Sequence, residues 1–403
     1  MVKLAREYHS NLQQKGIDTN IGPQEQSERT ENALNEILTT QKLSTTASDK
    51  LNWSLLQDQV MIALKSMKNG MATGLDRCPY NLWKTLDECY KEDKEKKKKK
   101  TFDIILVLAT VFADIQSNGV DKRTEFAEGW MCPIYKKKDP MEIENYRPIT
   151  LLNTDYKLLT RTMALLLMKP IRDLIHQGQV GFIPKRQIFD HIRLAKTVLT
   201  YAETMEVDGM IVALYQEKAY DKIRHDYLWE TLTKFNLPEV FMNTVRSLYE
   251  NAHTQVAING VMSEPFKVTR GVCQGDPLSC LLFDMAIEPL ACKIRNSKDI
   301  EGLNIPGLQE NIKINLFADD TTLYLNKNDR LDNVENILDE WCETSGAKFN
   351  LEKTEIIPFG TATHRANIIA ARKVNCEDEK NTRSTHKSCK RQRGGMITRS
   401  MAR

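Results

Sequence analysis

Residues 314–325 read Ile-Asn-Leu-Phe-Ala-Asp-Asp-Thr-Thr-Leu-Tyr-Leu, with two adjacent carboxylates, Asp319 and Asp320, between two apolar runs. This pattern predicts a strand, a tight turn that carries the acids, and a second strand. Neighbouring carboxylates lose free energy when they are desolvated together, so they must be solvated, paired or bound to a cation. Hard oxygens at a hairpin tip suit Mg²⁺. An Asp-Asp pair on its own is more often an acidic surface turn, so the choice between that and a metal site depends on motifs elsewhere in the chain.

Three further stretches accompany this pair. Residues 213–221 read Ala-Leu-Tyr-Gln-Glu-Lys-Ala-Tyr-Asp, and residues 270–279 read Arg-Gly-Val-Cys-Gln-Gly-Asp-Pro-Leu-Ser. Residues 345–354 read Ser-Gly-Ala-Lys-Phe-Asn-Leu-Glu-Lys-Thr. In order and rough spacing, the four stretches resemble the palm motifs of reverse transcriptases from non-LTR (LINE-type) retrotransposons. The resemblance covers roughly residues 117–360.

The resemblance implies an α+β, right-hand polymerase fold with fingers and palm, an antiparallel palm sheet packed on helices, and a thumb that is largely missing. It divides the chain into an N-terminal linker and helical region (1–116), a reverse transcriptase domain (117–361) and a basic tail (362–403). The first fifty residues are mostly polar and predict a loose linker with one short helix. The tail has few apolar residues and many Lys and Arg, which predicts disorder.

The implied reaction is RNA-templated DNA synthesis, with an RNA template, a DNA primer and dNTPs as partners and Mg²⁺ (or Mn²⁺) as cofactor. In such a transfer two metal ions, about 4 Å apart, bind the attacking and leaving oxygens. The family takes one carboxylate from its first palm motif and the others from the Asp-Asp hairpin. By this resemblance Asp319 is the surviving direct ligand, and Asp320 is an auxiliary ligand.

The first palm motif departs from the family at one position, where Tyr215 replaces the first Asp. A phenol that is protonated at neutral pH is a poor Mg²⁺ ligand. Glu217 shares the strand face of residue 215 and is the nearest substitute, whereas Asp221 lies too far along. We expect residue 215 and Asp319 to converge, with Cα atoms within roughly 10 Å, the reach of a shared metal pair.

Two motifs are assigned by resemblance to the nucleotide. Tyr220 would lie under the sugar and exclude a 2′-hydroxyl; its alternative is a core aromatic. Gln274 offers both a donor and an acceptor, and Gly275 allows a close backbone approach to a nucleotide or template base. The alternative for this loop is a plain strand-to-helix turn.

Basic residues supply the remaining predicted contacts. Arg147 and Lys137 belong to the expected fingers hairpin, where an Arg fork and a Lys point charge suit a triphosphate or a phosphate backbone. Lys353 follows the last palm helix and, by resemblance, approaches the triphosphate. Single exposed lysines are usually just solvated. The lysine-rich run at residues 91–100 is interpreted as a solvated loop in preference to a nucleic-acid contact.

Bulk properties restrict the class of protein. The nine cysteines include no Cys-x-x-Cys pair, which is typical of reduced, intracellular thiols. The longest apolar run, residues 104–111, is far shorter than a membrane span, and the N-terminus lacks an apolar signal region. We expect an intracellular protein, nuclear or cytoplasmic, that is neither secreted nor membrane-bound.

Three functional hypotheses follow. The chain is an RNA-directed DNA polymerase whose activity Tyr215 impairs, or a non-enzymatic relic that still binds nucleic acid, or a pseudogene product without function. No Cys/His cluster with metal spacing occurs in residues 361–403, so the zinc-binding region of such elements is not expected there. We interpret the sequence as a fragment or decayed copy of a retroelement polyprotein.

Overall fold

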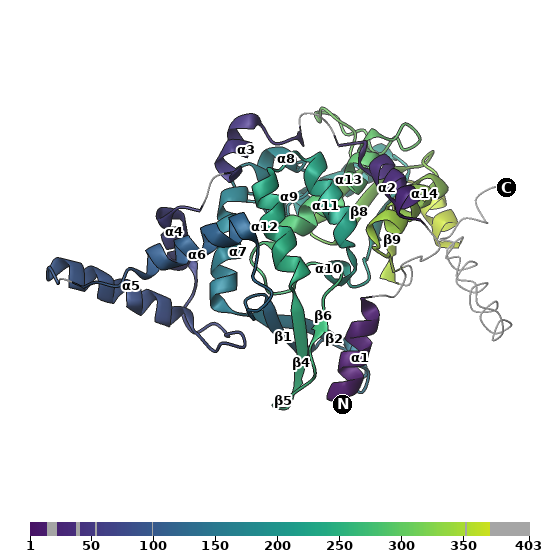
Figure 1. Cartoon of the computed structure of the whole chain (residues 1–403). Coiled ribbons are helices and arrows are strands. Elements are labelled where there is room, and N and C mark those ends of the chain that lie inside the picture. The colour runs from purple at the N-terminus through teal and green to yellow at the C-terminus, as the bar shows by residue number, and fades with distance from the viewer. Residues whose placement is uncertain (14–21, 38–40, 53–54, 99, 351–352, 371–403) are drawn as a thin grey trace. The chain divides into compact units, whose positions relative to one another are not determined.

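The computed structural model describes residues 1–13, 22–37, 41–52, 55–98, 100–350 and 353–370 (Figure 1). Most of the expected disordered tail, residues 371–403, lies outside the described residues. The chain forms two compact units. The first contains Met1–His176 and Lys218–Ala286, and the second contains Gln177–Glu217 and the described residues from Ile287 onward. We describe each unit by itself.

The first unit is built on one mixed sheet. Its strands are β2 (Tyr146–Leu152), β1 (Glu128–Tyr135), β4 (His253–Ile258) and β5 (Val261–Met262) in that order, with β6 (Phe266–Lys267) also paired to β4. β1 and β2 are antiparallel, as the predicted basic hairpin requires, whereas β1 and β4 run parallel. The sheet therefore joins the predicted fingers hairpin to a strand more than a hundred residues downstream.

A tight turn links β4 to β5. Asn259 and Gly260 both adopt positive φ, 52° and 79°, which is the backbone of the type I′ turn that Asn-Gly favours. The sequence predicts the return strand at residues 265–269; the structure has the shorter β6 there, and the two-residue β5 directly after the turn was not predicted. The sequence signal located the turn correctly because the left-handed conformation depends on these two residues alone.

Helices form the rest of this unit. They are α1 (Val2–Leu12), α2 (Pro23–Leu34), α3 (Thr45–Asn52), α4 (Gln57–Ser66), α5 (Tyr80–Glu95), α6 (Ile104–Asn118), α7 (Thr154–Leu167), α8 (Ile171–Leu174), α10 (Ala219–Lys222), α11 (His225–Lys234) and α12 (Glu239–Glu250). α13 (Ser279–Asn296) contributes its residues up to Ala286. The helix expected over residues 155–175 is divided into α7 and α8, and α8 begins directly after Pro170.

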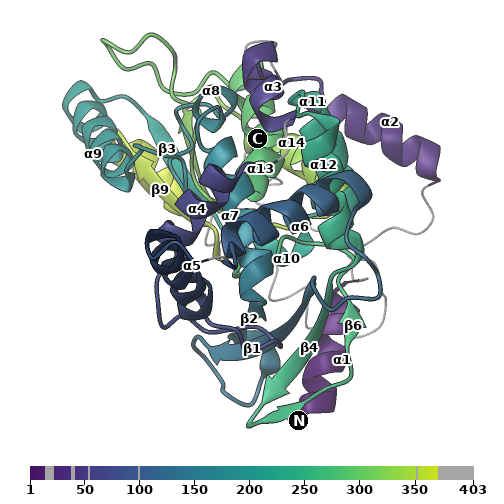
Figure 2. The same cartoon turned by 60° about the vertical axis from the view of Figure 1, so that its left-hand side comes forward.

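The first fifty residues are more ordered than the expectation of a loose linker. They contain α1, α2 and most of α3, and α1 lies against β4 and β6 (Figure 2). Ala5 of α1 packs with Met131, Val256 and Phe266 in one buried cluster. The polar composition obscured this helix because only a narrow side of it is buried. The expected domain boundaries stay a prediction.

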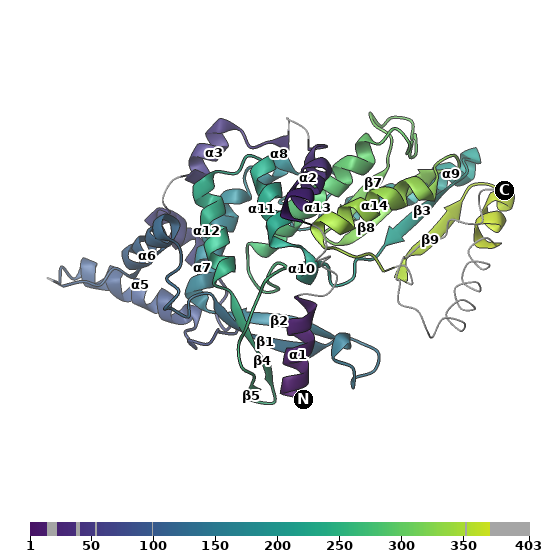
Figure 3. The same cartoon turned by 45° about the vertical axis from the view of Figure 1, so that its right-hand side comes forward.

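The second unit contains a four-stranded antiparallel sheet in the order β7 (Ile314–Phe317), β8 (Asp320–Asn326), β3 (Gly209–Leu214) and β9 (Glu355–Phe359). The strand at 210–214 and the hairpin are confirmed, whereas β9 was not predicted. The predicted final helix is α14 (Leu331–Ser345), which runs alongside this sheet (Figure 3).

Helices also cover this second sheet. α9 (Ile188–Met205) contacts β9, and its buried Val198 joins Ile211, Tyr324 and Phe359 in one core cluster. The α+β class and the antiparallel sheet packed on helices are thereby confirmed. Among the helices in the described part of the chain, none combines the length and apolar character that crossing a bilayer requires.

Candidate functional site

The two adjacent acids lie at the tip of a hairpin in the second unit. Phe317 pairs with Asp320, so Ala318 and Asp319 form a two-residue turn between β7 and β8. Ala318 has a φ of 54° at the first tip position, where hairpins of this length usually carry glycine. Asp319 is half-buried and Asp320 is exposed. The predicted presentation of the acids by a hairpin is confirmed.

The end of β3 lies beside this hairpin. Leu214, the last residue of β3, is paired with Thr321, the second residue of β8. Tyr215 and Asp320 are the next residues along the chain from this pair. Facing residues of an antiparallel pair have Cα atoms about 5 Å apart, and consecutive residues about 3.8 Å. The register brings the strand that precedes Tyr215 to the hairpin, and the expected Cα distance between residue 215 and Asp319 stays a prediction.

Lys353, on the segment that follows α14, lies next to Tyr215. The Asn350 amide donates to the Tyr215 carbonyl over 2.7 Å. The Lys353 Nζ then lies 4.1 Å from the centroid of the Tyr215 ring. At this distance the ammonium is attracted by the negative face of the ring. The structure therefore places the Lys353 ammonium on the residue that replaces the expected carboxylate.

Glu217, the nearest substitute carboxylate in the sequence, has another partner. Its amide donates to the Lys348 carbonyl over 2.7 Å, and its Oε2 lies 3.5 Å from the Lys348 Nζ. Glu217 also lies beyond the last residue of β3. This pairing with Lys348 argues against Glu217 as a replacement for the missing Asp.

The residues at the hairpin do not fit the two-ion site that the sequence resemblance implies. The implied set needs a carboxylate at position 215, where the structure has a phenol with an ammonium over its ring. Within the described residues, no group of three or more His, Cys, Asp or Glu side chains is arranged to hold a metal ion. Two carboxylates beside a positive charge hold a second divalent cation poorly.

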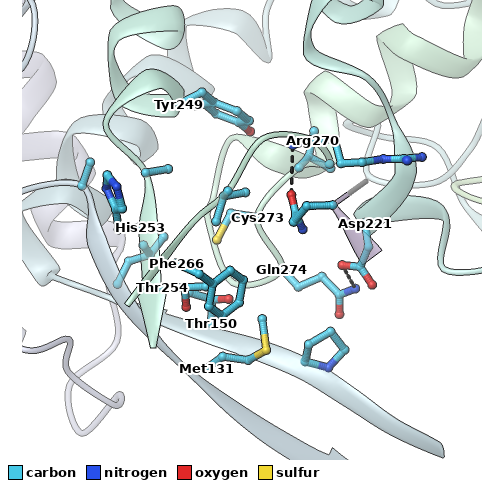
Figure 4. Close-up of a pocket in the computed structure, with 18 of the residues that line it drawn as sticks. Met131, Thr150, Asp221, Tyr249, His253, Thr254, Phe266, Arg270, Cys273 and Gln274 are labelled. Atoms are coloured by element: carbon cyan, nitrogen blue, oxygen red, sulfur yellow. Dashed lines mark hydrogen bonds between the residues drawn. The ribbon is translucent and has the colours of Figure 1, made fainter. Parts of the chain in front are cut away.

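The two residues that the resemblance assigns to the nucleotide, Gln274 and Gly275, lie in the first unit. The Gln274 Nε2 donates to Asp221 Oδ1 over 3.1 Å, and the two side chains point toward each other (Figure 4). The Gln274 carbonyl accepts from the Thr150 amide over 3.0 Å. Gly275 has a φ of 120°, and a Cβ there would lie 2.4 Å from the Thr150 carbonyl oxygen. Packing against β2 is thus sufficient to require this glycine, and the nucleotide contacts stay a prediction.

Tyr220 is the second residue of α10 and is only partly buried. Its ring stacks on Phe283, with centroids 4.6 Å apart and planes 13° from parallel. The stack holds the orientation of the ring while leaving part of it accessible, so it suits either interpretation of this residue. Arg147 and Lys137 are both exposed, Arg147 on β2 and Lys137 after the end of β1. Their nucleotide contacts also stay predictions.

A small cavity in the first unit was not predicted. It measures about 60 Å³, and Thr150, Tyr249 and Cys273 line it together with Asp221 (Figure 4). The Gln13 Oε1, at the end of α1, accepts from the backbone amides of Thr269 and Arg270 over 2.9 and 3.1 Å. No local sequence signal indicates this contact, because it joins positions more than 250 residues apart.

Burial raises the pKa of Asp221 from 3.8 to about 6. A raised carboxyl pKa stabilises the folded chain fully below about pH 4, and this contribution is lost as the pH rises through 6. The change amounts to about 3 kcal/mol, since one pKa unit is about 1.4 kcal/mol. We expect Asp221→Asn to remove about this much of the fall in unfolding free energy between pH 4 and pH 7, measured by urea unfolding.

Asp155 and Asp276 are the internal reference for that experiment. Burial raises the pKa of each to about 6 as well, so a residual pH slope should persist in Asp221→Asn. Identical slopes for the variant and the original chain would contradict the assignment to Asp221.

Comparison with known proteins adds a family match. Residues 135–383 match the family model described as "Reverse transcriptase (RNA-dependent DNA polymerase)". The chain is 32% identical over 219 residues to the transposon TX1 uncharacterized 149 kDa protein of Xenopus laevis, covering 54% of this chain and 17% of that protein. It is 29% identical over 181 residues to the Pol polyprotein of the type-2 retrotransposable element R2DM of Drosophila melanogaster, covering 45% and 16%.

Solved structures give a weaker likeness. An apo telomerase from Candida tropicalis, truncated from its C-terminal domain, aligns with a TM-score of 0.44 at 16% identity, covering 65% of this chain and 57% of that one. The chain spans less than a fifth of the length of the TX1 and R2DM proteins.

Proposed function

The chain belongs to the reverse transcriptase (RNA-dependent DNA polymerase) family, and we propose that it is the fingers-and-palm part of the right-hand polymerase fold in a non-LTR retrotransposon polyprotein. By family it is an RNA-directed DNA polymerase, a nucleotidyltransferase. The observation that carries the proposal is the pairing of Leu214, which precedes Tyr215, with Thr321, which follows Asp320. This register brings the end of β3 to the hairpin that carries the acid pair, and both belong to the second unit.

The proposed partners are an RNA template, a DNA primer and dNTPs. Arg147 and Lys137 are exposed on the fingers hairpin, where a guanidinium fork and an ammonium suit phosphates. Tyr220 would select the sugar, and Gln274 with Gly275 would approach a base or nucleotide. A protein that copies RNA into DNA inside the cell would be located in the nucleus or cytoplasm.

We further propose that nucleotidyl transfer is impaired in this copy. The family generally uses divalent metal ions; if Mg²⁺ or Mn²⁺ bound here, Asp319 would be the direct ligand and Asp320 the auxiliary one, without the carboxylate that the full set needs at position 215. When bound, such ions neutralise the charge that develops at phosphorus. Tyr215 removes one carboxylate from the ligand set, and the Lys353 ammonium over its ring adds a competing positive charge.

The alternative is a non-enzymatic relic of the same domain that retains nucleic-acid binding. Tyr215 with Lys353 favours it, because this pair fills the ligand position with groups that do not bind cations. A primer-extension assay beside an RNA–DNA binding assay tests both proposals. Binding with slow extension supports the impaired polymerase, binding without any extension supports the relic, and the loss of both contradicts both.

A further inference from the structure

A buried glutamine in the second unit forms hydrogen bonds with the turn that carries the acid pair. The Gln179 side chain is fully buried. Its Oε1 accepts from the Ala318 amide over 3.0 Å and from the Gly181 amide over 2.8 Å. Its Nε2 donates to the Ala318 carbonyl over 3.4 Å. One side chain thus contacts both backbone polar groups of the residue that precedes Asp319.

The segment around Gln179 pairs with β7 through its backbone. The Val180 amide donates to the Leu316 carbonyl over 3.0 Å, and the Leu316 amide donates to the Gly178 carbonyl over 2.7 Å. This parallel bridge sets the glutamine one residue pair away from the hairpin tip. The backbone pairing delivers the side chain to the turn, so the amide contacts do not depend on a flexible reach.

Gly181 allows this close approach. A Cβ on Gly181 would lie 2.4 Å from the Ala318 nitrogen, too close for any other residue. The Arg186 guanidinium also constrains this segment, because it donates to the Gln179 carbonyl over 2.7 Å. The segment 178–186 is therefore shaped to hold its backbone against the tip of the hairpin.

The turn needs such support because its conformation is unfavourable. Ala318 has a φ of 54°, in the left-handed region where a Cβ crowds the following carbonyl. A non-glycine residue keeps this conformation only when its surroundings hold it there. Hydrogen bonds from Gln179 to both polar groups of Ala318 supply that constraint.

We propose that Gln179 is a positioning residue, which fixes the Ala318 turn and thereby the placement of the Asp319 carboxylate for nucleotidyl transfer. The consequence for catalysis rests on the proposed function, whereas the effect on the hairpin does not. Gln179 does not itself reach substrate in this assignment; it acts through the turn.

Amide hydrogen exchange tests the effect on the hairpin. Gln179→Met keeps the length of the side chain and removes its hydrogen bonds. We expect it to raise the exchange rates at Ala318 and Asp320 by about tenfold or more, because both hydrogen bonds to Ala318 are lost together with the one to Gly181. Gln179→Glu, protonated in this buried place, retains both the acceptor and a donor and should keep those rates within about threefold of the original.

Ser345→Ala is the matched control. Ser345 is fully buried in the same unit, and its hydroxyl accepts from the Ala347 amide over 3.1 Å, away from the hairpin. It should lower the stability of the unit without singling out the tip. Unchanged rates at Ala318 in Gln179→Met, or an equal rise throughout β3, β8 and β9, would overturn the proposal.

The effect on catalysis is measured as the kinetics of primer extension in the Tyr215→Asp background. There Gln179→Met should lower kcat for primer extension by about tenfold with the dNTP KM unchanged, and Gln179→Glu should restore most of it. An unchanged kcat would overturn the catalytic part of the proposal. If Tyr215→Asp has no activity, the proposed function fails, and the exchange experiment still decides the role of Gln179.

Discussion

Tyr215→Asp should raise the rate of primer extension by about 10³-fold or more. The substitution returns a carboxylate to the residue after Leu214, whose partner Thr321 follows Asp320. It also removes the ring over which the Lys353 ammonium lies, 4.1 Å from the centroid. Electrostatic stabilisation of several kcal/mol is the usual size of such an effect at a developing charge. The measurement is single-turnover extension of a DNA primer on an RNA template.

Two further variants separate charge from shape. An asparagine side chain has nearly the size of aspartate but no charge, so Tyr215→Asn should extend primers as slowly as the original chain. Asp319→Ala in the Tyr215→Asp background should abolish the gain. If the original chain already extends primers as fast as Tyr215→Asp, residue 215 is not the defect. If Tyr215→Asp is inert while folded and bound to nucleic acid, the limiting defect lies elsewhere than at residue 215.

Affinity for an RNA–DNA hybrid should fall by about 10³-fold between roughly 50 and 200 mM salt if the chain neutralises six phosphates. Each neutralised phosphate releases condensed counterions, so the logarithm of the binding constant falls linearly with that of the salt concentration. The exposed Lys137 and Arg147 are expected among the contacts. Fluorescence anisotropy of a labelled hybrid measures the slope.

Charge-matched variants locate these contacts. Lys137→Ala with Arg147→Ala should reduce the salt slope by about two. Lys94→Ala with Lys96→Ala, in the lysine-rich run that begins on α5, removes the same charge and should leave the slope unchanged. A chain ending at Ala370 lacks residues 371–403, which hold every Lys and Arg of the basic tail except Arg365, and so tests the tail as the source. It keeps Thr361, whose amide donates to Asp208 over 2.8 Å. Binding that ignores salt, or no binding at low salt, would contradict this prediction.

Local patterns in the sequence were sufficient for elements whose signal lies within a few residues. The alternation around the acid pair predicted the β7–β8 hairpin, and Asn259-Gly260 predicted the turn between β4 and β5. An apolar stripe of Val334, Ile337, Leu338 and Trp341 predicts the inner face of α14; all but Ile337, which is half-buried, are buried. In each case the conformation depends on neighbours in the chain, so the residues themselves encode it.

Family motifs extended this reading to one long-range contact. The order of the motifs implied that residue 215 and the acid pair converge, and the pairing of Leu214 with Thr321 agrees with that prediction. The motifs carried this information because they belong to a fold already known. The same resemblance assigned Gln274 and Gly275 to a nucleotide, whereas packing against Thr150 is enough to explain Gly275.

The sequence by itself determined the hairpin, the helices with strong apolar stripes and the substitution at position 215. Only the tertiary structure decided what surrounds them: α1 against β4, β9 beside β3, Lys353 over Tyr215, and Gln179 on the Ala318 turn. The reason is physical. Periodicity records which side of a segment avoids water, and many partners could satisfy that requirement. The choice of partner depends on hydrogen bonds and close packing between residues more than a hundred positions apart, which no local pattern contains.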